Sequence, residues 1–281
     1  LIQQALKVPF ISCADSLFND SAVVFATEQE GDFGPHTIST ALKYGWAWKI
    51  PLTNRNGNGY VYSSRFVDDD KAESEFREHL GLLDSDVEAR RLKFKVGRVE
   101  QHWAKNCLAV GLSQGFIEPL EATALDMVQE TVTRFIEAYN NGNGTDQYRD
   151  DFNNRISARF DAVRDYIVCH YRISSRRDTD YWVANGNNEN ISPSLRSILM
   201  SWMAGKNITD ELLEQKLDVY FPNVSWNCLL TGKGIYPTPD QLRPGNELAH
   251  QYKIPEIREF IRRCALNFNP HLQQLESLRS Q

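Results

Sequence analysis

Six apolar residues recur at spacings of 4, 4, 3, 4 and 4, and this repeat constrains the fold more than any other feature of the chain. They are Phe152, Ile156, Phe160, Val163, Ile167 and Tyr171. Side chains three or four residues apart share one face of a helix, so the repeat predicts a long amphipathic helix. A similar repeat from Ala124 to Tyr139 predicts a second long helix. Two such helices require a common core against which their apolar faces can pack.

The first hundred residues instead favour strands and turns. Ser21–Thr27 and Gly45–Ile50 are rich in β-forming residues, and the Asn-Gly steps of Asn54–Gly59 are typical of a hairpin turn. Phe94–Arg98 is predicted to be another strand. We therefore expect an α+β chain with three parts. These are a β-rich portion at residues 1–100, a strand–loop–helix unit at 101–142 and a helical region at 143–281.

Composition excludes several classes of partner. The chain has 281 residues and a net charge of 31 − 37 = −6, so no broad positive field favours nucleic acid or an anionic membrane. No apolar run reaches the roughly 18 residues of a membrane-spanning helix. The 6 histidines are dispersed, without a metal-binding pattern. The 5 cysteines form no CxxC pair and indicate a reducing, cytoplasmic location.

The segment between the β-rich part and the first long helix carries most of the functional information. The predicted buried strand Cys107–Gly111 leads into a glycine-containing loop, and the helix is expected to begin near Leu120. A helix start presents unpaired N–H groups and the positive end of the helix dipole, which together favour an anion. Thr123 would add a hydroxyl donor in the same turn. The segment is therefore a candidate anion site.

The same segment holds two acidic residues, Glu118 and Glu121. Either carboxylate could bind a polar group of a substrate or transfer a proton. Acidic side chains are also common at helix starts, so both could simply favour the beginning of the helix. The residues alone leave both interpretations open.

Two tryptophans in GWAWKIP (45–51) form a second candidate site. Trp46 and Trp48 are two residues apart in a predicted strand and therefore share a face. They could form an aromatic wall beside a flat ligand, or they could be an ordinary core pair. Farther along, Asp178–Trp182 is predicted to be a loop with a buried aromatic anchor.

Five segments occur in the order seen in flavin-dependent tryptophan halogenases. They are GWAWKIP (45–51), GNGYVYSS (57–64), VGR (96–98), NCLAVGLSQGFIEPLEAT (106–123) and DTDYW (178–182). The chain resembles the C-terminal two-thirds of such an enzyme, from Leu1 to at least Pro237. The resemblance implies an α/β, flavin-monooxygenase-like fold in which the FAD domain is interleaved with a β-rich substrate domain and followed by a helical part. It also implies that the GxGxxG motif and the catalytic lysine precede Leu1, which is not a Met.

The resemblance implies a reaction and a set of site residues. Reduced FAD and O2 would oxidise chloride or bromide to hypohalous acid, which halogenates an electron-rich, indole-type ring. The implied partners are a separate flavin reductase and a small aromatic substrate, and a homodimer is allowed. The matching positions are Glu121 for the catalytic glutamate, Thr123 and Ala124 for the halide, Leu112, Ser113 and Leu125 for FAD, and Trp46 and Trp48 for the signature aromatic wall.

Two departures from the family pattern affect these expectations. Ala122-Thr123-Ala124 stands where the family usually has Ser-Thr-Gly, and the added methyl of Ala124 is expected to narrow the halide site or alter its preference. Only Tyr220 and Phe221 supply aromatic rings to the lid region, so other indoles, phenols and carrier-bound rings are candidate substrates. The alternatives are a flavin-dependent aromatic hydroxylase of the same fold and a non-catalytic fragment that binds an aromatic ligand.

Overall fold

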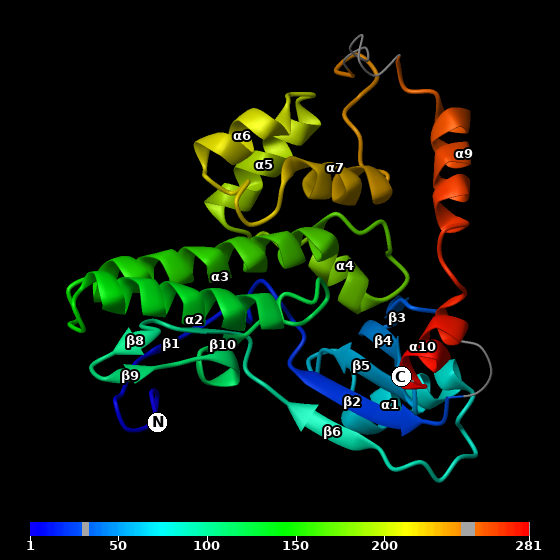
Figure 1. Cartoon of the computed structure of the whole chain (residues 1–281), viewed down its shortest axis with the longest axis horizontal. Coiled ribbons are helices and arrows are strands. Elements are labelled where there is room, and N and C mark those ends of the chain that lie inside the picture. The colour runs from blue at the N-terminus through cyan, green and yellow to red at the C-terminus, as the bar shows by residue number, and fades with distance from the viewer. Residues whose placement is uncertain (30–33, 243–250, 281) are drawn as a thin grey trace.

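The computed structural model describes residues 1–29, 34–242 and 251–280 in three layers (Figure 1). A five-stranded antiparallel sheet lies at one side, a hairpin of two long helices crosses the middle, and a group of shorter helices covers the far side of this hairpin. The observed mixture of helices and sheets agrees with the expected fold class.

The five-stranded sheet has the order β3-β4-β5-β2-β6, with every neighbouring pair antiparallel. Its strands are β2 Ser21–Thr27, β3 Ile38–Leu42, β4 Gly45–Pro51, β5 Asn56–Tyr62 and β6 Arg90–Lys93. Helix α1, Asp69–Leu80, covers one face, where Phe76 packs against Phe25 and Tyr60. The opposite face carries Trp46 and joins the main core beneath the long helices.

The central strand β5 depends on a glycine. Gly59 pairs with Trp48 across the β4–β5 ladder. A Cβ atom on Gly59 would lie 2.0 Å from the indole ring of Trp48, so only glycine lets this ring lie against the strand. The position of Trp48 is therefore set by the residue opposite it.

Two strand predictions need correction. The hairpin turn lies at residues 52–55, where Leu52 N donates to Arg55 O, and Asn56–Gly59 belongs to β5 instead. Pairing on both sides, with β2 and β4, outweighs the turn preference of the Asn-Gly steps. Residues 94–96 lie outside any strand, between β6 and β7, Gly97–Val99. Strand β7 pairs with β1, Phe10–Ser12, and with β10, Gly115–Phe116.

The two long helices predicted from periodicity are present. They are α2, Ala124–Asn141, and α3, Arg149–Arg172, which pack as a hairpin (Figure 1). All six residues of the first repeat, from Phe152 to Tyr171, are buried. The apolar periodicity therefore identified the face of α3 that packs on the main core.

The segment predicted as a loop after α3 begins a helix. Helix α4 spans Asp180–Gly186, and the Thr179 hydroxyl accepts a hydrogen bond from Trp182 N at its start. Tyr181 and Trp182 are buried, as the predicted aromatic anchor requires. The threonine cap and the burial of Tyr181 and Trp182 against the core account for this short helix.

The remaining elements complete the described chain. They are β8 Trp103–Ala104, β9 Cys107–Leu108, the 3-10 turn η1 Gly111–Ser113, α5 Pro193–Met203, α6 Ile208–Glu214, α7 Asn223–Gly232, α9 Ile254–Ala265 and α10 His271–Arg279. Within the described ranges, no helix combines the length and apolar character needed to cross a bilayer. The same residues contain no cluster of His, Cys, Asp and Glu suited to a metal ion.

Candidate functional site

The segment from Gly111 to Ala124 differs from its prediction in a way that shapes the site. Of the predicted strand Cys107–Gly111, only Cys107–Leu108 is a strand. Gly111–Ser113 forms η1, and α2 begins at Ala124 instead of near Leu120. Ala122 N donates to Pro119 O across a tight turn, and Ala122 has a φ of 55°. This left-handed conformation is incompatible with a continuous helix, so the turn delays the start of α2.

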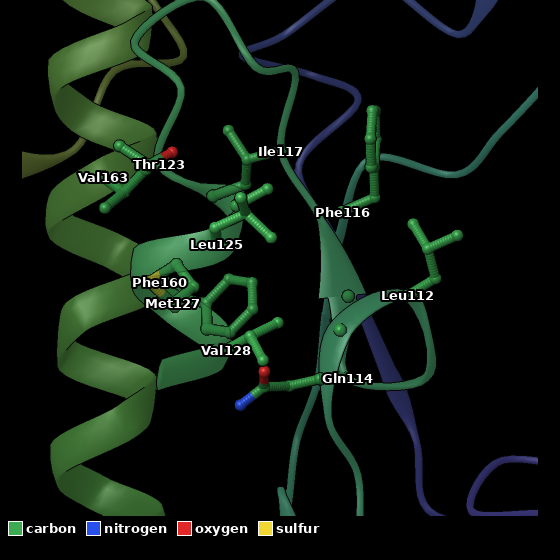
Figure 2. Close-up of a pocket in the computed structure, with 13 residues that line it drawn as sticks. Leu112, Gln114, Phe116, Ile117, Thr123, Leu125, Met127, Val128, Phe160 and Val163 are labelled. Carbon is green, nitrogen blue, oxygen red and sulfur yellow. The ribbon is translucent and has the colours of Figure 1, made fainter. Parts of the chain in front are cut away.

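The turn directs its neighbouring side chains into two different cavities. The first cavity has a volume of about 160 Å³ and lies between the η1 loop, the start of α2 and α3 (Figure 2). It is lined by Leu112, Thr123, Ala124 and Leu125 from the predicted site, together with residues that include Phe160 and Val163 of α3. Figure 2 shows Leu112 on the loop side and the α3 residues opposite it. The structure therefore brings together four residues assigned to FAD or halide.

The first cavity has the character expected for a flat apolar group with an anion beside it. Leu112 and Leu125 are each 81% exposed at its edge, which is unusual for leucine. Thr123 is the N-cap of α2, and its hydroxyl makes no capping hydrogen bond. The first N–H groups of α2 and this hydroxyl are thus placed to donate to an anion. Leu112 and Leu125 could contact an apolar ring, and the start of α2 could donate to an anion, as the predicted FAD and halide assignments require.

Ser113 lies beside this cavity but does not line it. Its hydroxyl accepts from Val110 N and donates to Val110 O, so the side chain is used to shape η1. The assignment of Ser113 to FAD remains a prediction, and any contact would have to come from its exposed surface.

The second cavity contains Glu121 and has a volume of about 340 Å³. Its other lining residues are Ser39, Thr40, Ala41, Trp46, Leu120, His170, Tyr171, Trp182 and Lys233. They come from β3, β4, the turn before α2, the end of α3, α4 and the end of α7. Aromatic walls meet one acidic and two basic side chains in this cavity, a combination found in many sites that bind small aromatic molecules.

Two basic groups accompany Glu121 in this cavity. His170 Nε2 lies 2.6 Å from Glu121 Oε1, although the two groups are not aligned as a regular hydrogen bond. Lys233 is half-buried at the end of α7, and burial lowers the pKa of its ammonium group. Neither basic residue was predicted from the sequence, because each lies at least 49 positions from Glu121 and no local pattern marks it.

The tryptophan pair is divided between two roles. The rings of Trp46 and Trp48 lie side by side, with centroids 5.8 Å apart and planes tilted by 52°. Trp46 is buried and lines the Glu121 cavity, whereas Trp48 is half-buried against Gly59. The structure thus brings Trp46 to Glu121 and places Trp48 behind it.

The interpretation of both glutamates as helix-start residues is wrong. The acidic residue in the first turn of α2 is Asp126, and the two glutamates precede the helix. Glu118 is fully buried, where its Oε2 accepts from Trp46 Nε1 at 2.7 Å and from Asn19 Nδ2 at 2.9 Å. Burial raises the pKa of Glu118, although its hydrogen bonds oppose the shift. The two glutamates therefore occupy different environments three residues apart.

Comparison with known proteins gives a consistent result. The family model for tryptophan halogenase matches residues 1–246. The 7-chloro-L-tryptophan 6-halogenase KtzR of Kutzneria sp. (strain 744) is 33% identical over 99% of this chain and 54% of its own length. The tryptophan 7-halogenase RebH of Lentzea aerocolonigenes is 33% identical over 93% of this chain and 50% of its own length.

Solved structures are similar over the same extent. The tryptophan 6-halogenase SttH of Streptomyces toxytricini matches with a TM-score of 0.88 at 30% identity, over 98% of this chain and 54% of that one. The flavin-dependent halogenase BrvH of Brevundimonas sp. BAL3 matches with a TM-score of 0.83 at 33% identity, over 99% of this chain and 56% of that one. The chain thus spans about half the length of the relatives it matches. With its fold, its motifs and its family match in agreement, the chain belongs to the flavin-dependent tryptophan halogenase family.

Proposed function

We propose that the protein is a flavin-dependent halogenase that places chlorine or bromine on an electron-rich, indole-type ring. The observation that supports this most strongly is the arrangement around Ala122. Thr123 on one side lines an apolar cavity at a helix start, and Glu121 on the other lines an aromatic cavity. A halide-oxidation site and a ring-binding site would thus lie next to each other along the backbone.

The first cavity would serve the halide. When bound, reduced FAD supplies the oxidation of the halide by O2, and Leu112, Ser113 and Leu125 are the residues that would hold it. The N–H groups at the start of α2 and the Thr123 hydroxyl would bind the halide, since an anion is favoured at this end of the helix dipole. The methyl group of Ala124 lines the same cavity and would limit the size of the ion.

The second cavity would serve the aromatic substrate. Trp46 and Trp182 offer flat apolar surfaces for the ring, and Glu121 lies at the same cavity. In the overall reaction an aromatic C–H and hypohalous acid become a C–halogen bond and water. The Glu121 carboxylate would stabilise the positive charge that develops on the ring and accept the proton that leaves the carbon.

The lid region leaves the substrate range of this cavity open. Tyr220 and Phe221, the aromatic residues expected to form a lid, are engaged elsewhere: Phe221 stacks on Tyr166 at 3.8 Å, and the Tyr220 ring lies under Arg159. We therefore infer that the substrates to test include L-tryptophan, simple indoles and phenols. A separate flavin reductase would deliver the reduced FAD.

The experiment uses the protein that carries this chain, with FAD, NADH, a flavin reductase, bromide or chloride, and this panel of aromatic compounds. We expect halogenated products by mass spectrometry, and none without halide. Glu121→Gln should lower the rate by about 100-fold or more. Glu137→Gln, an exposed change on α2, is the matched control and should retain the rate.

Two outcomes would replace the proposal with its alternatives. Hydroxylated products formed without halide would make the protein an aromatic hydroxylase. Binding of the aromatic panel with no oxidation under any condition would indicate a non-catalytic, ligand-binding chain.

The Ala124→Gly variant tests whether the Ala124 methyl group limits the size of the halide. A wider site should raise the amount of brominated product relative to chlorinated product.

A further inference from the structure

Glu118 is the most completely buried acidic group of the described residues near the site, and the proposed reaction does not use it. We propose that Glu118 is a positioning residue that uses one oxygen, Oε2, to hold the indole of Trp46 and the phenol of Tyr171 in the wall of the Glu121 cavity. The inference rests on the proposed function only in taking that cavity as the substrate site.

Three donors converge on this single oxygen atom. Trp46 Nε1 donates to Glu118 Oε2 at 2.7 Å, the Tyr171 hydroxyl donates at 2.5 Å, and Asn19 Nδ2 donates at 2.9 Å. Trp46 comes from β4 and Tyr171 from α3, and both side chains line the cavity. The same oxygen therefore ties one wall from the sheet to another from the long helix.

A second layer fixes the amide that supports this oxygen. Asn19 Nδ2 also lies 3.0 Å from the Tyr171 hydroxyl, and the Tyr181 hydroxyl donates to Asn19 Oδ1 at 2.9 Å. Asn19 is 1% exposed and Tyr181 is likewise buried. Five residues from separate parts of the sequence thus meet in one buried network, in which each lost bond leaves a buried polar group unpaired.

The other oxygen of Glu118 takes no part in this network. Oε1 is buried and has no hydrogen-bond partner among the described residues. Burial raises the pKa of Glu118 and so favours the neutral acid over the carboxylate. Oε2 can accept the three bonds in either form. Glutamine has the same shape as this acid, with a carbonyl oxygen that can replace Oε2.

The signal of the Trp46 indole N–H provides a test that needs no halogenation. In 15N-labelled protein, the Trp46→Phe variant identifies this signal among those of the 6 tryptophans. In the wild type we expect its hydrogen exchange to be at least about tenfold slower than that of free tryptophan, since the bond is buried and accepted by a carboxyl group. Exchange at the rate of the free amino acid would overturn the proposal without any variant of Glu118.

Two substitutions separate positioning from general stability. Glu118→Gln should keep the slow exchange within about threefold, and Glu118→Met should accelerate it by about tenfold or more while the β4 amides stay protected. The matched control is Glu75→Met, which removes a carboxylate that accepts from Tyr60 on the opposite face of the sheet and should leave the Trp46 signal unchanged. If Glu118→Met does not fold, the exchange rates of the Trp46 indole N–H in the wild type and in Glu118→Gln still test the proposal. Rapid exchange in Glu118→Gln, or slow exchange in a folded Glu118→Met, refutes the proposal.

Discussion

The buried histidine His102 predicts a specific loss of stability in mild acid. His102 is completely buried and stacks on Phe160 with ring centroids 5.3 Å apart. Its Nε2 lies 3.3 Å from the Ser157 hydroxyl, and its Nδ1 has no partner among the described residues. Burial lowers the pKa of His102 to about 3, the positive charge of Arg98 adds to the effect, and the carboxylate of Asp161 opposes it.

The sign and size follow from proton linkage. The folded protein keeps His102 neutral down to about pH 3, whereas the unfolded chain protonates it below about pH 6.5. The unfolded state therefore binds more protons in this window, and stability is present above pH 6.5 and lost as the pH falls. At about 1.36 kcal/mol per pH unit, the free energy of unfolding should drop by about 2 kcal/mol between pH 7.5 and pH 5.0 from this residue alone.

Urea unfolding of the wild type and of His102→Gln at these two pH values measures the effect. Since other buried groups also titrate, the informative quantity is the difference between the two proteins. Between pH 7.5 and pH 5.0, the free energy of unfolding should fall by about 2 kcal/mol less in His102→Gln than in the wild type. His79→Gln, which replaces an exposed histidine on α1, is the control for the substitution itself. If His102→Gln and the wild type lose the same free energy within about 0.5 kcal/mol, the linkage argument is refuted.

Two further predictions concern packing and buried hydrogen bonds. Gly59→Ala places a Cβ 2.0 Å from the indole ring of Trp48 and should lower the free energy of unfolding, measured in urea, by about 1–3 kcal/mol. Gly57→Ala, whose added Cβ would have its nearest atom 3.9 Å away, should lower it by less than about 1 kcal/mol. Equal losses in the two variants would contradict the steric explanation. Asn153→Ala removes the acceptor of His102 N and Trp103 N and the donor to Trp103 O. It should lower the free energy of unfolding by roughly 3 kcal/mol, because three buried backbone groups lose their partners. A loss below about 0.5 kcal/mol would show that these groups find other partners.

The elements that local sequence encodes strongly were predicted well. The repeat from Phe152 to Tyr171 identified the buried face of α3. The structure shows equally local signals at α1, where Asp68 is the N-cap and Gly81 is a left-handed C-cap. These signals act between residues at most four positions apart, so neighbouring residues are sufficient to specify them. The family motifs added the assignment of Glu121, Thr123 and Ala124, which no periodicity could have supplied.

The elements that were mispredicted are those where distant contacts override local preference. The Asn-Gly steps before Tyr60 favour a turn, yet two neighbouring strands hold them in β5. The turn at Ala122 delays the start of α2 and separates Glu121 from Thr123. Local propensities are weak compared with the burial and strand pairing that these segments gain in the folded protein.

The sequence by itself determined the helix and strand periods, the family and the identity of the candidate catalytic and halide residues. Only the tertiary structure decided which groups surround them. His170 lies 2.6 Å from Glu121, and Lys233 lines the same cavity. Asn19 lies 99 positions from Glu118 yet donates a hydrogen bond to it. The physical reason is that a period is set by residues three or four positions apart, whereas a site is set by the packing of segments whose separation in sequence carries no local signal.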